Sequence, residues 1–396
     1  MAWPEIRTIP QTSGSFPAES QLSKPDLPIR AYFLLPRQNT VFAHDWLIHH
    51  YKMTSHAYWQ ETEDWHTEGE PFRIVQKLPT NSLDPNLNVA DQRLHILSTP
   101  DHPLDLLRQS LCHEPRGHAD MYGGFITPPN DRAAHFGVLF WHKDGFSTAC
   151  GHGTIALGYW AIANALVKAP QNGDIDVVID VPSGRVTARA HREDGKTTHI
   201  DFLNVPSYQV AKAIPATVQL YEKSVSLEME FTFGGAIYAC VDVADLGLAV
   251  EPANHQTFID IQRQIKRQHV KYRYQEQYDI YGVCFFAKMP SNNEDTVIQK
   301  NVVVFADGQI DRSPCGSGTA ARVAVLLAQG NLNSSKTLKH LSIINTVFEA
   351  GVGTTTSSPT DFPACIPWTR GTARLVGRMN FYIDPSDPVY PGFLLR

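Results

Sequence analysis

Two cysteines occupy the same short pattern in this sequence. The segment CGHGTIA begins at Cys150, and the segment CGSGTAA begins at Cys315. In both, a glycine-rich turn leads into an apolar stretch, as at the start of a helix. Backbone N–H groups and the positive end of the helix dipole would converge on each sulfur and favour a thiolate. Two such thiols could remove a proton from one face of a carbon and deliver one to the other, which predicts a cofactor-independent racemase or epimerase.

The glycines also have a structural interpretation, because a strand-to-helix turn often needs a positive φ. A structural turn, however, does not require cysteine at the same place in both copies, whereas a two-base site does. We expect the other cysteines to be ordinary thiols in or beside apolar runs, or in the loop-like segment around the last of them. They are Cys112, Cys240, Cys284 and Cys365.

The elements that would position the two thiols are strands and two apolar helices. The pattern predicts helices from Thr154 to about Lys168 and from Gly318 to about Gln329, with Gly330 as the C′ glycine of the second. Neither helix has a polar face of any width, so both belong inside the protein. Short strand-like runs dominate the remainder. The predicted fold is therefore α/β, with two similar domains, each a curved, mostly antiparallel sheet around a central helix, and with both helix N-termini in the interdomain cleft.

Composition divides the chain into four parts. Residues 1–56 are rich in proline and polar residues and are predicted to form a poorly ordered extension, in which Ala31–Leu35 could add an edge strand. The first α/β half spans 57–205, the second spans 206–370, and 371–396 would return to the first half. Residues 350–367 look irregular where a strand and hairpin are expected.

Charge and cysteine usage exclude several classes of function. The chain has 396 residues and a formal net charge of −6, which provides no basic field for nucleic acid. No apolar run approaches the roughly 20 residues of a membrane span, and no secretion signal is evident. Six cysteines without a CxxC pair indicate a reducing, cytoplasmic compartment. No HExxH or comparable spacing suggests a metal, and no Walker or dinucleotide pattern suggests a nucleotide, so we expect no cofactor.

Several longer motifs resemble those of the proline racemase family, which includes proline racemases, hydroxyproline 2-epimerases and trans-3-hydroxy-L-proline dehydratases. The family fold is similar to that of diaminopimelate epimerase, with two pseudo-symmetric halves and the site in the cleft between them. The motifs cover roughly residues 60–396 and comprise DWHTEGEP from Asp64, EPRGHADMYG from Glu114, the segment Cys150–Gly158, DRSPCGSGT from Asp311, and the tail from Gly371 to Phe393.

The resemblance implies roles for individual residues. Cys150 and Cys315 would be the acid/base pair across the substrate Cα, and an amino acid would be the only small-molecule partner, with no metal and possible assembly as a homodimer. The implied substrate-binding residues are the amides of Gly151, His152, Gly316 and Ser317 for the carboxylate, the side chains of His152 and Asp311 for the ring nitrogen, and Tyr122 and Phe305 as walls around the ring. An aromatic residue at strand spacing is equally compatible with plain core.

The choice of reaction depends on Cys315. Dehydratases of the family place threonine there, since eliminating a 3-hydroxyl does not require a second thiol, so Cys315 favours inversion at Cα. Glu70 is typical of the racemase and dehydratase branches, whereas 4-hydroxyproline epimerases usually have asparagine there, and this favours proline itself. Ala236 stands where many relatives have asparagine. The alternatives are a trans-3-hydroxy-L-proline dehydratase and an inactive family member that acts as a binding module.

Overall fold

The computed structural model describes residues 56–275 and 278–395. The predicted extension therefore lies outside the described residues except for its last one, as does its candidate strand Ala31–Leu35. Within the described ranges, no helix is both long enough and apolar enough to cross a membrane. Mixed α/β structure dominated by strands agrees with the predicted fold class.

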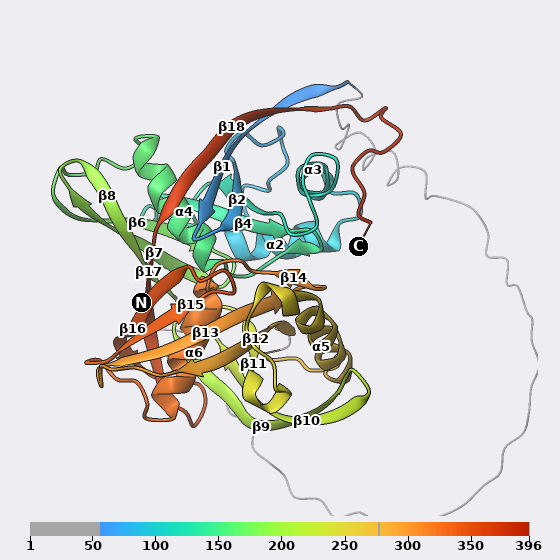
Figure 1. The fold of residues 1–396 in the computed structure, drawn as a ribbon. Helices are drawn as coiled ribbons and strands as arrows, with labels where there is room; N and C mark the ends of the chain where they lie inside the picture. Colours follow the sequence, from blue (N-terminus) through green and yellow to red (C-terminus); the bar gives the residue numbers. More distant parts are fainter. Residues whose placement is uncertain (1–55, 276–277, 396) are drawn as a thin grey trace, which may run out of the picture. The chain divides into compact units, whose positions relative to one another are not determined.

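The first half of the described chain contains eight strands and three helices (Figure 1). The strands are β1 Tyr58–Thr67, β2 Glu70–Val75, β3 Tyr122–Thr127, β4 Phe136–His142, β5 Gly145–Phe146, β6 Gly173–Val181, β7 Gly184–Glu193 and β8 Lys196–Leu203. The helices are α2 Val89–Ser98, α3 Pro103–Cys112 and α4 Gly151–Ala163.

The second half contains nine strands, and one further strand follows it. The strands are β9 Ser207–Leu220, β10 Lys223–Phe233, β11 Ile237–Asp242, β12 Ile280–Met289, β13 Thr296–Phe305, β14 Gln309–Ile310, β15 Thr337–Leu341, β16 Val347–Thr356 and β17 Ala364–Gly371, followed by β18 Ala373–Ile383. The helices are η1 Val243–Leu246, η2 Pro252–Asn254, α5 His255–Gln268 and α6 Gly316–Ala328.

Strand pairing follows the same order in both halves. In the first half β2 is antiparallel to β1 and parallel to β3, β4 is antiparallel to β3 and β5 and parallel to β6, and β6, β7 and β8 are antiparallel neighbours. The series from β10 to β17 repeats each of these pairings with the same sense. Along the chain, a central helix follows the fifth strand of each series and precedes the sixth: α4 in the first half and α6 in the second. The repeated cysteine segment is therefore part of a larger structural repeat.

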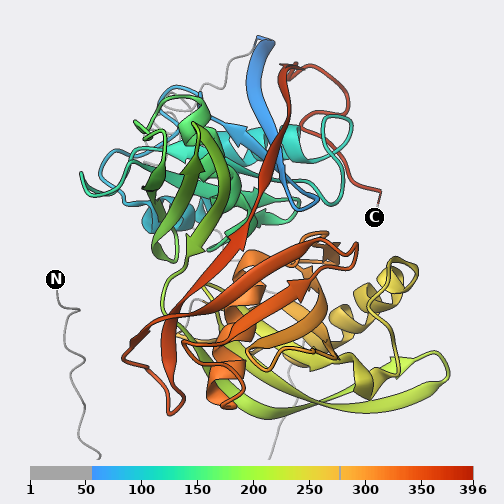
Figure 2. The ribbon, with the colours of Figure 1, turned by 60° about the vertical axis from the view of Figure 1, so that its left-hand side comes forward.

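Long-range pairings curl each series of strands around its helix. In the second half β9 pairs with both β10 and β17, which closes the ring of strands. β17 also pairs with β8, and β18 continues from β17 to pair with β1 along its whole length (Figure 2). Because β17 joins strands of both halves, the sheet is continuous across the two, and the domain limits drawn from the sequence stay a prediction.

The two central helices are buried, as the sequence predicts. Leu157 and Trp160 of α4, and Val323 and Val325 of α6, are at most 2% exposed. An α-helix that is apolar on all sides is stable only when other elements surround it, and the curled strands do so here. α6 ends at Ala328 with Gly330 at φ +73°, which confirms the C′ glycine.

Two expectations about local structure were wrong. The first helix ends at Ala163 rather than near Lys168, because the chain leaves the helical region at Ala165, where φ is +57°. Most of residues 350–367 are regular, since they belong to the antiparallel pair β16 and β17, and only 357–363 between the two strands lack regular structure. The glycines there serve packing: a Cβ at Gly351 would lie 2.8 Å from the Trp368 ring, and one at Gly353, in a bulge, would lie 2.4 Å from the Ile366 carbonyl oxygen.

Candidate active site

The two repeated cysteines are the N-cap residues of the central helices. The Cys150 Sγ accepts a hydrogen bond from the Gly153 amide at 3.2 Å, and the Cys315 Sγ accepts one from the Gly318 amide at 3.3 Å. Both residues are buried, at 4% and 6% exposed. The sulfur takes the place of the hydroxyl or carboxylate oxygen that usually caps a helix, so the local sequence alone aims each thiol at the start of its helix.

The two helix N-termini touch at a pair of glycines. A Cβ built on Gly151 would lie 2.6 Å from the Gly316 Cα, and one built on Gly316 would lie 2.6 Å from the Gly151 Cα. The same positions are 2.8 Å from the Ser317 amide nitrogen and 3.0 Å from the His152 amide nitrogen. Only glycine permits this approach, and it brings the first turns of α4 and α6 together from opposite halves.

These first turns form a potential anion site. Within the described residues, no acceptor pairs with the backbone N–H groups of Gly151, His152, Gly316 or Ser317. Free first-turn amides combined with two helix dipoles favour a carboxylate or a similar small anion. The four amides predicted to bind a carboxylate are therefore grouped at the junction of the two halves.

His152 lies between Cys150 and two aromatic rings. Its Nδ1 and Nε2 are 3.5 and 3.6 Å from the Cys150 Sγ, and its ring centroid is 5.0 Å from that of Tyr122 and 5.9 Å from that of Phe72. Burial lowers the pKa of His152 to about 3, so the imidazole is neutral at physiological pH. A neutral imidazole can accept a hydrogen bond from a ligand ammonium group.

Asp311 is a buried carboxylate on the opposite half. Its Oδ1 accepts hydrogen bonds from the Ser313 amide at 2.8 Å and the Ser313 hydroxyl at 2.7 Å. Burial raises its pKa to about 6, although the Ser313 hydroxyl and the Arg312 charge oppose the rise. The Ser313 hydrogen bonds and the Arg312 charge thus offset only part of the cost of burying the ionised carboxylate. A cation that enters the site would stabilise ionised Asp311 further.

Burial also acts on the two thiols. It raises the pKa of Cys150 and of Cys315 well above the ordinary value, and the amide bonds from Gly153 and Gly318 offset only part of the increase. The expected preference for thiolate is therefore wrong for the enclosed site, because loss of solvation outweighs the helix amides. A positive charge close to the sulfur atoms would be needed to lower the two pKa values again.

The sequence of this chain matches a known protein family. The family model described as proline racemase matches residues 63–394. The chain belongs to the proline racemase family. A trans-3-hydroxy-L-proline dehydratase of Bacillus cereus is 37% identical over 340 residues, covering 84% of this chain and 97% of that protein. A proline racemase of Acetoanaerobium sticklandii is 33% identical over 341 residues, covering 83% of this chain and 96% of that protein.

Two solved structures share the fold. A probable proline racemase from Agrobacterium radiobacter with bound carbonate matches with a TM-score of 0.76 and 24% identity, covering 85% of this chain and 96% of that chain. A hydroxyproline epimerase from Agrobacterium vitis with bound trans-4-hydroxy-L-proline matches with a TM-score of 0.73 and 24% identity, at the same coverage. At this level of identity the likeness establishes the fold of this family member and not its substrate.

The predicted aromatic walls meet beside His152. The ring centroids of Tyr122 and Phe305 are 5.7 Å apart. A tyrosine that the sequence analysis overlooked completes the group: Tyr281 stacks on Phe305 at 5.7 Å, and its hydroxyl lies 3.1 Å from that of Tyr122. The repeat contained a signal for it, because a Tyr-Gly pair stands at the start of both β3 and β12.

Two further sets of contacts at the site were not expected from the sequence. The Tyr238 hydroxyl lies 2.6 Å from the Ser317 Oγ and 4.0 Å from the Cys315 Sγ. Glu70, fully buried in the first half, pairs with Arg312 of the second half at 3.0 Å and also accepts its amide hydrogen at 2.8 Å. This ion pair joins the halves next to Asp311, and its members are too distant in sequence to be paired by any motif.

A cavity of about 840 Å³ adjoins the aromatic walls. Tyr281 and Ser147 form part of its lining, together with the cationic side chains of Arg93 and Lys266, whereas neither Cys150 nor Cys315 lines it. Because the thiols are only 4% and 6% exposed, a ligand must displace side chains or separate the halves to reach them.

The remaining cysteines are buried thiols, as expected. Cys240 and Cys284 face each other in the parallel pair β11 and β12. Cys365 was assigned to a loop-like segment, but it lies in β17 and has no exposed surface. Its strand was not recognised because glycines and polar residues dominate the stretch before it.

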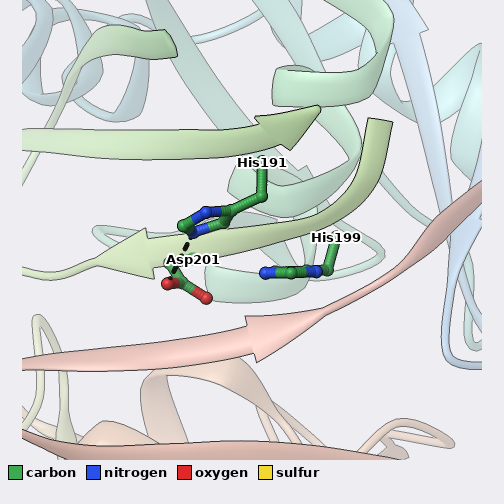
Figure 3. A group of neighbouring side chains, drawn as sticks. All are labelled: His191, His199 and Asp201. Carbon is green, nitrogen blue, oxygen red and sulfur yellow. Dashed lines mark hydrogen bonds and ion pairs between the residues drawn. The ribbon is translucent and has the colours of Figure 1, made fainter. Parts of the chain in front are cut away.

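A separate cluster on the first half contains His191, His199 and Asp201, residue types that bind metals (Figure 3). The groups already satisfy one another. The two nitrogens of His191 lie 2.8 Å from carboxylate oxygens of Asp174 and Asp201, and Arg370 binds both oxygens of Asp201 at 2.7 and 2.8 Å. We interpret the cluster as an ion-pair network across β6, β7, β8 and β17, and assign no metal to it.

Proposed function

We propose that this protein is a cofactor-independent isomerase that inverts the configuration at Cα of proline or a hydroxyproline. The observation that carries the proposal is the pair of buried cysteines that cap two abutting helices, one from each half. Inversion requires a base on one face of the carbon and an acid on the other, and this is the arrangement that two facing half-sites can supply.

The proposed binding mode uses the charges of the amino acid. The substrate carboxylate would accept hydrogen bonds from the free amides of α4 and α6, which also stabilise the extra negative charge as Cα loses its proton. The ring nitrogen, as an ammonium group, would donate to neutral His152 and ionised Asp311. Its positive charge would lower the pKa of the nearby thiols, which burial alone raises, and so make a thiolate accessible.

In the proposed step, the thiolate of Cys150 takes the Cα proton, so that the C–H bond breaks and an S–H bond forms. The carboxylate takes up the electron pair as an enediolate. The S–H group of Cys315 then gives its proton to the opposite face and becomes the thiolate. The reverse reaction uses the same groups in exchanged roles, and exclusion of water prevents competing protonation.

The second candidate is a trans-3-hydroxy-L-proline dehydratase. Relatives that carry this name are 35–37% identical to the chain, compared with 33% for a relative named proline racemase. Removal of the Cα proton by one thiol would be common to both reactions. We rank inversion first because Cys315 supplies the second proton carrier, which elimination of a 3-hydroxyl does not require.

Incubation in deuterated water tests this ranking. Purified protein is given L-proline, trans-4-hydroxy-L-proline or trans-3-hydroxy-L-proline, and the products are followed by NMR and chiral chromatography. Deuterium at Cα with inversion supports the isomerase. Formation of a cyclic imine without inversion of any substrate would make the dehydratase correct, and ligand binding without exchange would indicate a binding module.

Substitution of the thiols tests the mechanism. Cys150→Ser and Cys315→Ser should each lower turnover by several orders of magnitude, because serine is a poor base at neutral pH. Cys365→Ala, at a buried thiol on β17, is the matched control and should retain activity. Near-normal inversion by either serine variant would exclude the two-thiol mechanism.

A planar inhibitor tests the anion site. Pyrrole-2-carboxylate resembles the flattened transition state and should bind competitively, whereas its amide should not bind. Equal affinity for acid and amide would argue against carboxylate binding by the helix amides.

The homodimer and the cytoplasmic location expected from the sequence remain proposals. The oligomeric state can be measured by sedimentation.

A further inference from the structure

The two cysteines differ in backbone conformation although they share a sequence pattern. Cys150 is extended, with φ −154° and ψ 101°, whereas Cys315 has φ +63° and ψ 108°. Residues with a side chain rarely adopt a positive φ, and they keep it only where neighbouring contacts enforce it. The position of the second thiol therefore depends on the groups that hold its backbone.

Those groups surround Cys315 on both sides. The Ser313 Oγ accepts the Cys315 N–H at 3.1 Å. The carbonyl of Pro314 accepts hydrogen bonds from the Asn301 side chain at 2.9 Å and from the Thr319 hydroxyl at 3.1 Å. Ser313, Asn301 and Thr319 have no exposed surface, so water does not compete for these bonds.

Ser313 connects this backbone to Asp311. Its hydroxyl donates to the Asp311 Oδ1 at 2.7 Å while its oxygen accepts the Cys315 N–H. A hydroxyl has one proton, and as long as it points at an ionised carboxylate, its lone pairs remain available to the Cys315 amide. If Asp311 takes up a proton, the carboxyl group becomes a weaker acceptor and this orientation is less firmly held.

We propose that Ser313 is a positioning residue that links the Asp311 carboxylate to the backbone of Cys315, so that the second thiol is held in place when Asp311 is ionised. The part that concerns substrate rests on the proposed function, in which Asp311 binds the ring nitrogen. Binding of the ammonium group would then order the acid that completes inversion.

Among the residues that the structure describes, the first half shows no corresponding link. The residue two positions before Cys150 is Thr148, and its hydroxyl donates to the Gly235 carbonyl oxygen at 2.8 Å. The hydrogen-bonded link through a serine is thus expected for Cys315 only. The Asp311 charge itself raises the pKa of both thiols, so comparison with Cys150 separates the effect of the link from the effect of the charge only when Ser313→Ala is measured beside the wild type.

The test compares Ser313→Ala with Ser386→Ala. Ser386 makes the same pair of hydrogen bonds, from its amide at 2.8 Å and its hydroxyl at 2.7 Å to the Asp384 Oδ1, but at an exposed site. Alkylation of each cysteine by iodoacetamide is followed by peptide mass spectrometry between pH 5 and 8. In the wild type and in Ser386→Ala, the rate at Cys315 relative to Cys150 should change as Asp311 titrates. In Ser313→Ala this change should become clearly smaller, and the part that remains is the direct effect of the Asp311 charge on the Cys315 thiol, whose pKa that charge raises.

Turnover provides a second readout. Ser313→Ala should lower kcat by about 10- to 100-fold, as expected for a misplaced reacting group, and should change KM by less than about threefold. The reason is that the Ser313 amide still holds Asp311 for the substrate nitrogen. Ser313→Thr, which keeps a hydroxyl, should recover most of the loss. A raised KM with unchanged kcat would overturn the proposal.

The alkylation experiment needs no substrate, so its result stands even if the protein catalyses dehydration, in which case kcat is taken from that reaction. An unchanged pH dependence at Cys315 in Ser313→Ala would overturn the proposal by itself. If circular dichroism shows that this variant does not fold, Asn301→Ala replaces it. That variant removes the bond to the Pro314 carbonyl and a longer contact with the Cys284 sulfur. It should lower kcat by a smaller factor, and a kcat equal to that of the wild type would count against the proposal.

Discussion

The contact between Gly151 and Gly316 predicts a large effect of one added methyl group. In Gly151→Ala the new Cβ would lie 2.6 Å from the Gly316 Cα, whereas carbon atoms in contact prefer about 3.5–4.0 Å. The helix termini would have to separate by about 1 Å, because the obstacle is backbone and cannot rotate away. Displacement of this size at a reacting centre lowers turnover by about 100-fold.

The loss should appear in activity more than in folding. The strain falls at the junction of the two halves, so a small separation of α4 and α6 relieves it, and the cost of the added methyl group should not exceed about 1–3 kcal/mol. Deuterium exchange at Cα of L-proline measures the activity, and urea denaturation measures the free energy of unfolding. Pyrrole-2-carboxylate affinity should fall in parallel, since the same movement separates the amides that bind the carboxylate.

Gly377→Ala serves as the control for this substitution. A Cβ there would meet only the flexible end of Met379, at 3.4 Å. It should leave both exchange and inhibitor binding unchanged. The reasoning is refuted if Gly151→Ala exchanges Cα protons within about threefold of the wild-type rate while its fold is intact.

Three further predictions concern charge and reaction type. Burial raises the pKa of Asp311 from 3.8 to about 6, so between these pH values the unfolded chain releases this proton while the folded chain keeps it, and stability falls as the pH rises. We therefore expect Asp311→Asn to favour the folded state more at pH 7 than at pH 4. The change in the free energy of unfolding that the substitution causes, measured in urea, should be about 1–3 kcal/mol more positive at pH 7. An equal change at both pH values would contradict the raised pKa of Asp311. Cys315→Thr should suppress inversion and reveal water loss from trans-3-hydroxy-L-proline, detected as a cyclic imine; retained inversion would show that Cys315 is not the second proton carrier. Arg73→Met should cost about 3–5 kcal/mol because it leaves Asp64, bound at 2.8 Å in the core, without its partner, whereas Lys77→Met at an exposed pair should cost less than about 1 kcal/mol.

Sequence reasoning succeeded where the chemistry is local. Each thiol lies within a few residues of the helix amide that donates to it and of the glycine that permits the helix contact. The motif therefore already contains the geometry of these groups. The apolar composition of α4 and α6 likewise required that strands surround them. Because the segment occurs twice, two half-sites could be inferred without any structure.

Only the tertiary structure decided which groups meet, and which lose their solvation, when the halves come together. Glu70 and Arg312 meet across the junction, and the Tyr122 and Tyr281 hydroxyls meet there as well, although no local pattern relates the members of either pair. The thiol pKa values show the same limit. The sequence predicted their stabilisation by helix amides, but burial, which depends on everything packed around a sulfur atom, has the larger effect and the opposite sign. A motif determines which groups are present, whereas their protonation is determined by how much water the complete fold excludes.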